Sequence, residues 1–415
     1  MRASNHAAGS VLRWLALGCT AAVVLAACGS GSGGSSAKQS TTSTTAGAPV
    51  PATYRTLYNQ LAAQIAAIKP GKVPAKSPTV FATDLTVANS NLGPALLGPN
   101  EMTKVDQQLA VFENLGIRGV TIQLNYPLLD TAFPDQSAYV AFYKGVADDI
   151  HARKMTLGIE TNEILTGTPY SSVQWNYQGL TTDSYAAGKA AMANTIIATM
   201  APAYLALETE ADTAAHATGL PLNDPTTYAS VVSKEVAALA PHPGTLVGAG
   251  PGSWQPTTFA TQLAKIAGLD YIDTHVYPIN ATDIANAEAT SRIAHAANKQ
   301  AVMDEAWLYK GTPTQAGGPG GAGNLQAHES SYFSFFAPLD QQFLDKLVAL
   351  TRADGFLYFS ANQSFAMSAY LAYEDAMASQ AFAQITHQYD AVVVPALQSG
   401  STTDTGNHYQ QLISG

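Results

Sequence analysis

Residues 119–162, GVTIQLNYPLLDTAFPDQSAYVAFYKGVADDIHARKMTLGIETN, contain two short apolar runs, at 119–126 and 155–162, on either side of a longer mixed stretch. The length and the aliphatic character of each run indicate a buried strand. The stretch between them begins at Asp135 and then places these apolar residues on one helical face: Ala138, Phe142, Val146 and Ile150. The segment therefore predicts a strand, a helix and a second strand, which is the repeating unit of a parallel sheet.

The same unit recurs along the body of the chain. Its apolar runs cover residues 79–85, 119–126, 155–162, 203–210, 245–250, 271–278, 300–307 and 355–362. They are spaced by about 35 residues, the length that one strand and its crossover helix need. Helix-start signals occur in the gaps, such as Asn100 before one expected helix and Asp224-Pro225 before another.

Eight such units predict an α/β fold of the closed (β/α)8 type, the TIM barrel. A doubly wound open sheet is the alternative, but it normally carries a glycine-rich nucleotide loop after its first strand, and this sequence has none. Residues 54–68 predict an extra N-terminal helix, which we expect to pack under the barrel. We assign residues 52–396 to the barrel and residues 397–415 to a polar C-terminal tail.

The composition limits the classes of partner. Of the 415 residues, 47% are apolar and 12% are charged, so the chain can bury a large core. The formal charge of −10 argues against a nucleic acid as partner. The nine histidines lack metal-ligand spacing, and neither a zinc-peptidase motif nor a phosphate loop occurs. We therefore expect a monomer with no cofactor and no metal ion.

The N-terminus predicts export and lipidation. Residues 1–27 have a positively charged start and an apolar stretch, as a signal peptide does. Their end, Leu25-Ala26-Ala27-Cys28, resembles the bacterial lipobox, which implies that Cys28 is acylated and becomes the mature N-terminus. Residues 28–51 are rich in Gly, Ser and Thr and predict a flexible tether. We expect a lipid-anchored protein of the cell envelope, with an ordinary cleaved signal peptide as the alternative.

Acidic residues gather where the expected strands end, although the chain is poor in charge. The acids at these strand ends are Asp84, Glu160, Glu163, Glu208, Glu210, Asp304 and Glu305, and three further polar residues, Asn125, His275 and Tyr277, lie with them. The carboxyl ends of barrel strands form the active-site face, so this bias predicts a site there. Glu208 and Glu210 share one face of their strand, and Glu210 can reach the barrel mouth even where Glu208 is a buried structural acid.

Three strand ends resemble one family. AYLALETEAD (203–212), DYIDTHVYP (270–278) and VMDEAW (302–307) together resemble the clan A glycoside hydrolases. These are retaining (β/α)8 enzymes of the cellulase, mannanase and galactanase type. The resemblance implies that Glu210 is the acid/base and Glu305 the nucleophile. It also implies that Tyr277 donates a hydrogen bond to Glu305 and that His275 lies beside Glu210.

The sequence departs from the family at the substrate contacts. Thr209 stands where the family usually has asparagine, and the second strand ends in Gln123, Asn125 and Tyr126 where arginine is common. Trp254 and Trp307 follow strands and are expected to stack on sugar rings. The full set of expected substrate-binding residues is His275, Tyr277, Trp307, Trp254, Asn125, Thr209, Glu160 and Asp84.

The expected function is hydrolysis of a β-linked poly- or oligosaccharide with retention. Two carboxyls in one mouth push their pKa values apart, and we expect Glu210 protonated and Glu305 ionised. A retaining pair is separated by about 5 to 5.5 Å. Two alternatives remain from the sequence: a non-catalytic carbohydrate-binding lipoprotein on a degenerate barrel, and a transglycosylase that uses the same glutamates.

Overall fold

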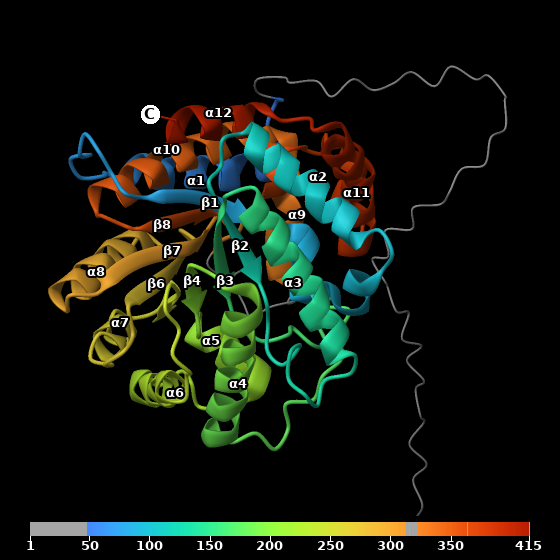
Figure 1. Cartoon of the computed structure of the whole chain (residues 1–415). Helices are drawn as coiled ribbons and strands as arrows, with labels where there is room; N and C mark the ends of the chain where they lie inside the picture. The colour runs from blue at the N-terminus through green and yellow to red at the C-terminus, as the bar shows by residue number, and fades with distance from the viewer. Residues whose placement is uncertain (1–47, 313–314, 316–321, 363, 415) are drawn as a thin grey trace, which may run out of the picture.

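The computed structural model describes residues 48–312, 315, 322–362 and 364–414. Eight parallel strands pair in chain order and close into a barrel (Figure 1). The strands are β1 (Val80–Asp84), β2 (Gly119–Gln123), β3 (Thr156–Glu160), β4 (Tyr204–Ala206), β5 (Leu246–Ala249), β6 (Tyr271–Val276), β7 (Gln300–Ala306) and β8 (Tyr358–Ala361). Each of the eight expected runs contains one strand, so the (β/α)8 prediction is confirmed and the open sheet is excluded.

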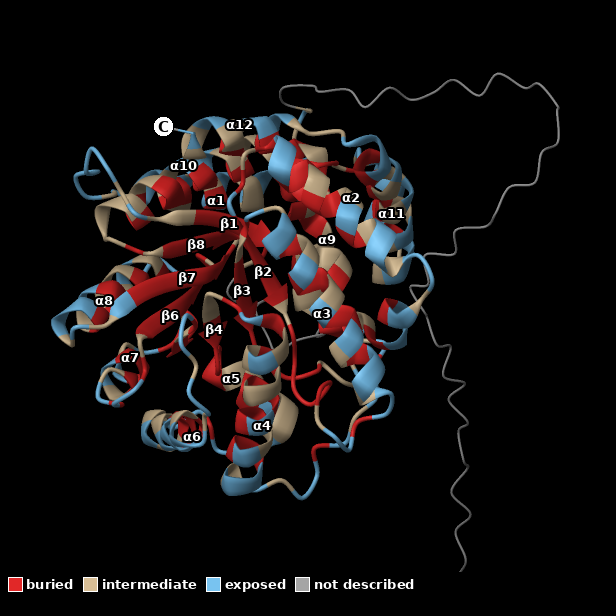
Figure 2. Cartoon of the chain, viewed as in Figure 1, coloured by how far each residue is buried: buried red, intermediate tan, exposed pale blue. Residues whose placement is uncertain are grey.

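Helices surround the barrel and turn their exposed faces outward, while the strands are buried (Figure 2). They are α1 (Arg55–Ala67), α2 (Glu101–Asn114), α3 (Gln136–Ala152), α4 (Thr182–Met200), α5 (Ala211–Thr218), α6 (Pro225–Ala237), α7 (Thr258–Leu263), α8 (Asp283–Ala296), α9 (Ala322–Ser330), α10 (Ala337–Ala353), α11 (Phe382–Ser399) and α12 (Asp404–Ile413). The predicted cap of α6 is formed, because the Asp224 side chain accepts a hydrogen bond from the backbone of Thr227.

The C-terminal segment belongs to the fold, which differs from the expected polar tail over residues 397–415. Helix α12 packs against α10 in the outer ring (Figure 1). Tyr409 is fully buried and donates a 2.9 Å hydrogen bond to the backbone oxygen of Ala82 in β1. The helix was not predicted because its buried face consists of one tyrosine with two small neighbours, Thr405 and Gly406, and so has no apolar periodicity.

The extra N-terminal helix is present as α1, but it does not lie under the barrel as expected. It packs along α10 on the outside of the ring (Figure 1). Leu61 and Ile65 form its buried stripe, and Gln64 donates a hydrogen bond to the backbone of Ile279. Cys28 and the signal peptide lie outside the described residues. Within the described part of the chain, no helix combines the length and apolar character needed to cross a membrane.

Tyrosines fill the barrel interior at its N-terminal end. The ring of Tyr204 contacts the rings of Tyr271 and Tyr358, at centroid distances of 6.1 and 4.9 Å. Gly248 of β5 provides the space for Tyr271, because a Cβ at that position would lie 2.1 Å from a ring carbon. Backbone and ring therefore meet too closely here for any residue other than glycine.

We expect Gly248→Ala to lower the free energy of unfolding by about 1–3 kcal/mol, because the added methyl group overpacks the barrel interior. Chemical denaturation followed by circular dichroism measures this change. Gly145→Ala in α3 is the matched control, since its Cβ would meet only the flexible end of Met102 at 3.6 Å. That substitution should leave stability unchanged or raise it by up to about 1 kcal/mol. Equal effects of the two variants would contradict this explanation.

Candidate active site

Glu210 lies just after β4, where the chain leaves the sheet and begins α5. Its backbone has a φ of 48° and a ψ of 69°, in the left-handed region. Residues other than glycine adopt this conformation rarely, and such outliers concentrate at functional sites. The conformation ends the strand alternation, so the Glu210 carboxyl reaches the mouth while Glu208 does not.

Glu305 is near the end of β7, at an irregularity of the barrel. The pairing of β7 with β8 shifts register between Met303 and Ala306, and the pairing with β6 shifts over the same level. Such bulges redirect side chains and are common next to active sites. Here the shift allows two consecutive residues, Asp304 and Glu305, to contact the same inward-facing histidine.

The end of strand β6 and the residue that follows it connect the two glutamates. His275 and Tyr277 are two residues apart and both project inward, as alternation requires. His275 Nδ1 lies 2.8 Å from Glu210 Oε1 and 3.9 Å from Glu305 Oε2. The Tyr277 hydroxyl lies 3.0 Å from Glu210 Oε1 and also bonds Glu305 Oε1.

The shared tyrosine limits the separation of the glutamates and fixes their protonation. Two oxygens that contact one hydroxyl lie within two hydrogen-bond lengths, at most about 6 Å apart. The hydroxyl of Tyr277 has a single hydrogen, so it can donate to only one of the two carboxyls. The other contact requires a proton on the second carboxyl, and the pair therefore holds one proton between Glu210 and Glu305.

The charges around the pair differ from the sequence expectation. Burial alone would raise the pKa of Glu210, but the hydrogen bond and charge of His275, with further hydrogen bonds from Thr213 and Tyr277, lower it overall. Burial raises the pKa of Glu305, and His275 and Tyr277 offset that increase only in part. The resting proton is therefore favoured on Glu305 and not on Glu210, because His275 lies closer to Glu210.

The environment of His275 favours the charged form of its imidazole. Burial opposes a charged imidazole, but the charge of Glu305 and the close contacts with Asp304, Glu160 and Glu210 raise the pKa of His275 well above its usual value. Its second nitrogen, Nε2, lies 3.0 Å from both Glu160 Oε2 and Asp304 Oδ1. Glu160, an expected substrate-binding residue, is thus placed beside His275.

Glu305 has two further partners that sequence reasoning did not assign. Gln123 at the end of β2 donates a 2.7 Å hydrogen bond from Nε2 to Glu305 Oε2. Asn362, just beyond β8, also bonds the Glu305 side chain. Gln123 lies at the end of the second strand, where the family commonly has arginine. Its place at that strand end could have identified it as a partner of Glu305.

Aromatic rings lie beside the carboxyl pair. Trp254 stacks on Tyr277 with centroids 4.9 Å apart and planes at 15°, and Trp307 meets Tyr277 edge-on at 5.2 Å. All three side chains are half-buried. Asp212, which the sequence analysis missed, accepts a 2.9 Å hydrogen bond from the Trp254 indole and fixes its orientation.

Three other residues expected to bind substrate, Asp84, Asn125 and Thr209, form hydrogen bonds with protein groups. Asp84 accepts a hydrogen bond from the backbone of Ser364. Asn125 accepts one from the backbone of Asn162, whose side chain in turn bonds the hydroxyl of Thr209. The structure thus places Asp84 at the end of β1 and Asn125 and Thr209 just beyond β2 and β4, where these buried side chains bond other protein groups.

Glu163 and Glu208 lie on the other side of the strands, against α4. Lys189 is almost fully buried, with Nζ 3.3 Å from Glu208 Oε1 and 3.5 Å from Glu163 Oε1. Burial raises the pKa of Glu208 to about 7, although the charge of Lys189 lowers it in part. These two acids therefore belong to a structural ion-pair cluster, and Glu210 is the acid after β4 that faces the mouth.

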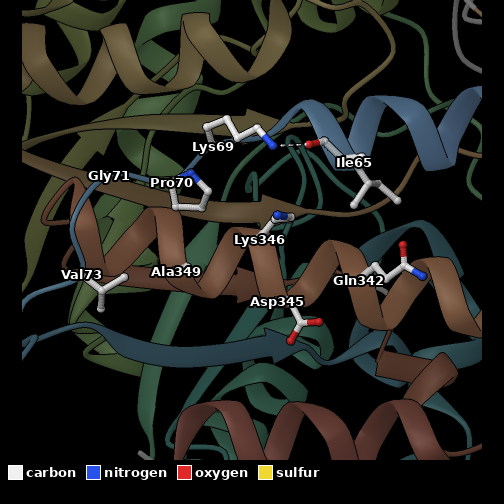
Figure 3. Close-up of a pocket in the computed structure, with 10 residues that line it drawn as sticks. Ile65, Lys69, Pro70, Gly71, Val73, Gln342, Asp345, Lys346 and Ala349 are labelled. Atoms are coloured by element: carbon white, nitrogen blue, oxygen red, sulfur yellow. Dashed lines mark hydrogen bonds between the residues drawn. The ribbon is translucent and has the colours of Figure 1, made fainter.

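A hollow of about 720 Å³ lies elsewhere, on the outer surface between the end of α1 and α10 (Figure 3). Lys69, Val73, Asp345 and Lys346 are among its lining residues. None of the expected site residues lines it. It is therefore a surface feature separate from the barrel mouth.

Solved structures with the same fold include glycoside hydrolases. The exo-β-1,4-mannosidase Op5Man5 from Opitutaceae bacterium strain TAV5 has a TM-score of 0.52 at 11% identity, over 84% of this chain and 61% of that chain. GH5_18 from Streptomyces cattleya in complex with GlcNAc has a TM-score of 0.53 at 13% identity, over 82% of this chain and 80% of that chain. This chain thus spans about three fifths of the mannosidase.

Comparison of the sequence with protein-family models and with curated proteins finds no match. At 11–13% identity the structural similarity establishes the barrel fold that the chains share. The chemistry of the site therefore has to be argued from this chain's own residues.

Proposed function

We propose that this protein hydrolyses β-linked glycosides with retention of configuration, using Glu210 and Glu305. The observation that carries the proposal is the contact of both carboxyls with the single hydroxyl of Tyr277. That contact supports a separation in the retaining range of about 5 to 5.5 Å and leaves little room for the water of an inverting enzyme. The half-buried rings of Trp254 and Trp307 beside the pair supply flat apolar surfaces for a sugar.

Glu305 is the proposed nucleophile because Tyr277, Gln123 and Asn362 fix its carboxyl in one orientation. Glu210 is the proposed acid/base, on the opposite side of the mouth. Attack requires the charge on Glu305 and the proton on Glu210, the reverse of the resting preference. Tyr277 connects the two carboxyls, so the proton can pass between them inside the site without exchange with solvent.

The activity should show a broad bell-shaped pH dependence, since the one-proton form of the pair is the active one. The lowered pKa of Glu210 moves the acidic limb to lower pH, and the raised pKa of Glu305 moves the alkaline limb to higher pH. The hydroxyl of Tyr277 can donate to either carboxyl, and it lowers the pKa of the one that accepts its hydrogen. Tyr277→Phe should therefore shift both limbs of the kcat/KM profile to higher pH, and a profile that does not move would contradict this role.

The substrate class can be tested with aryl β-glycosides. The neighbours with this fold include a β-1,4-mannosidase and a protein solved with GlcNAc, so aryl β-mannosides, β-glucosides and β-galactosides form the first panel. Proton NMR of the first-formed product reports the stereochemistry, and we expect the β-anomer to appear first. An α-anomer as the first product would contradict retention, and no turnover with preserved glycan binding would favour a binding protein.

We also propose that Cys28 carries a lipid anchor, on the basis of the sequence Leu25-Ala26-Ala27-Cys28 and the tether that follows. Metabolic labelling with palmitate should mark the wild-type protein in a bacterial host, and Cys28→Ala should abolish the label. Cys19→Ala is the matched control. Cys19 is the other cysteine of the chain and lies within the expected signal peptide, so this variant should keep the label. Labelled Cys28→Ala protein would contradict the proposal.

A further inference from the structure

A second set of acids converges on the far nitrogen of His275, away from the contact with Glu210. Nε2 lies 3.0 Å from Asp304 Oδ1 and 3.6 Å from Asp273 Oδ2. Asp273 and His275 alternate along β6 and therefore share its inner face, and Asp304 comes from the irregular end of β7. The three donor atoms lie within 4.8 Å of one another.

These donor atoms are buried and are not satisfied by hydrogen bonds. Asp273 and His275 are fully buried, and Asp304 is 5% exposed. Among the residues that the structure describes, Asp273 Oδ2, His275 Nε2 and Asp304 Oδ1 have no hydrogen-bond partner of suitable geometry. Buried polar atoms without partners cost free energy, so a group that satisfies all three is expected between them.

The negative charge that these acids carry when ionised also has to be balanced. Glu160, Asp273 and Asp304 all lie within 4 Å of Nε2, and within the described part of the chain His275 is the only basic side chain in ion-pair contact with them. One imidazolium can balance only one ionised carboxyl, so the three buried acids have to hold protons or share a metal ion.

We infer that Asp273, His275 and Asp304 bind a divalent first-row metal ion through Oδ2, Nε2 and Oδ1. Metal bonds of about 2.0–2.2 Å place neighbouring ligand atoms about 3.0–3.6 Å apart, which agrees with the two distances from Nε2. One imidazole with two carboxylates suits zinc, manganese or iron. Glu160 Oε2, 3.0 Å from the same nitrogen, lies next to the site and can supply further negative charge.

The other side of His275 fits this assignment. A metal-bound histidine normally donates its second ring N–H to a carboxylate, which fixes the tautomer. His275 Nδ1 makes that contact with Glu210 Oε1 at 2.8 Å. A metal ion bound to Nε2 would replace the proton that this nitrogen otherwise carries beside the acids. Binding of the ion is a property of these residues alone and does not depend on glycoside hydrolysis.

The test is titration of the full chain, freed of metal by a chelator, with ZnCl2 in a calorimeter and with MnCl2 in an EPR spectrometer. We expect one ion per chain and a higher melting temperature with either metal. Pulsed EPR of bound Mn²⁺ should detect coupling to one imidazole nitrogen, a result that needs no variant. A folded chain that binds no ion stoichiometrically, or Mn²⁺ without imidazole coupling, would overturn the proposal in favour of bound protons.

Variants locate the site. Asp273→Asn and Asp304→Asn replace a ligand by an amide of nearly equal shape, and each should weaken the affinity for Zn²⁺ at least tenfold. Glu235→Gln is the matched control, because Glu235 is a fully buried carboxylate of α6 outside the donor set. It should bind one ion with unchanged affinity. Unchanged binding in both aspartate variants, or equal loss in Glu235→Gln, would refute the assignment.

Discussion

Glu305→Ala should lower turnover by about 10⁶-fold, the scale expected when a covalent nucleophile is removed. The variant keeps the acid/base but has no group to form the glycosyl intermediate. The side chain that is lost makes its hydrogen bonds inside the mouth, with Tyr277, Gln123 and Asn362, so the barrel should still fold. Steady-state kinetics with an aryl β-glycoside, on protein shown to be folded by circular dichroism, measures the effect.

The cavity left by Glu305→Ala provides a second readout. Added azide should occupy the space of the carboxylate, attack the anomeric carbon and restore turnover with an inverted glycosyl azide as product. Glu235→Gln, which replaces a buried acid of α6 on the outer side of the barrel, is the control and should keep near-wild-type activity. Full activity of Glu305→Ala without azide would exclude Glu305 as nucleophile.

Glu210→Gln should lower the rate by about 10²–10⁴-fold on glycosides with poor leaving groups, which need a proton on the departing oxygen. The loss should be much smaller for an aryl glycoside whose phenol leaves readily, because that bond breaks without protonation. Measuring kcat/KM across phenols of increasing pKa gives the dependence on the leaving group. The wild-type protein should show a shallow slope and Glu210→Gln a steep one.

A matched substitution distinguishes Glu210 from Glu208, which precedes it by two residues after β4. Glu208→Gln changes an acid that pairs with Lys189 behind the sheet, so it should alter stability while the slope against leaving-group pKa stays shallow. A steep slope for Glu208→Gln, together with a shallow one for Glu210→Gln, would show that the wrong acid of β4 has been assigned.

The sequence could predict the barrel because each strand is marked twice, by an apolar run and by the helix signals that follow it. The run at 271–278, for example, matches β6 (Tyr271–Val276), and Asp224-Pro225 correctly predicts the start of α6. Helix α12 was missed for the opposite reason, since Tyr409 is its main buried apolar residue and gives no periodic pattern. The position of α1 beside α10 depends on long-range packing, which periodicity does not report.

Glu210, His275, Tyr277 and Glu305 could be named as a site because barrel topology brings strand ends together. The direction of their pKa shifts could not be predicted, because it depends on His275 lying 2.8 Å from Glu210 and 3.9 Å from Glu305. The contact between Gln123 and Glu305 likewise depends on barrel closure. The grouping of Asp273 and Asp304 with His275 needs the register shift in β7, which no local pattern indicates.

The assignment of Glu305 as the nucleophile can be tested by trapping the covalent intermediate with a 2-deoxy-2-fluoro β-glycoside that has a good leaving group. The fluorine slows breakdown of the glycosyl-enzyme, so the adduct should accumulate and be located by mass spectrometry of peptides. We predict a mass increase of one fluoroglycosyl unit on the peptide that contains Asp304-Glu305-Ala306-Trp307. An adduct on the peptide that contains Glu208-Thr209-Glu210, or rapid turnover of the substrate with no adduct, would contradict the account.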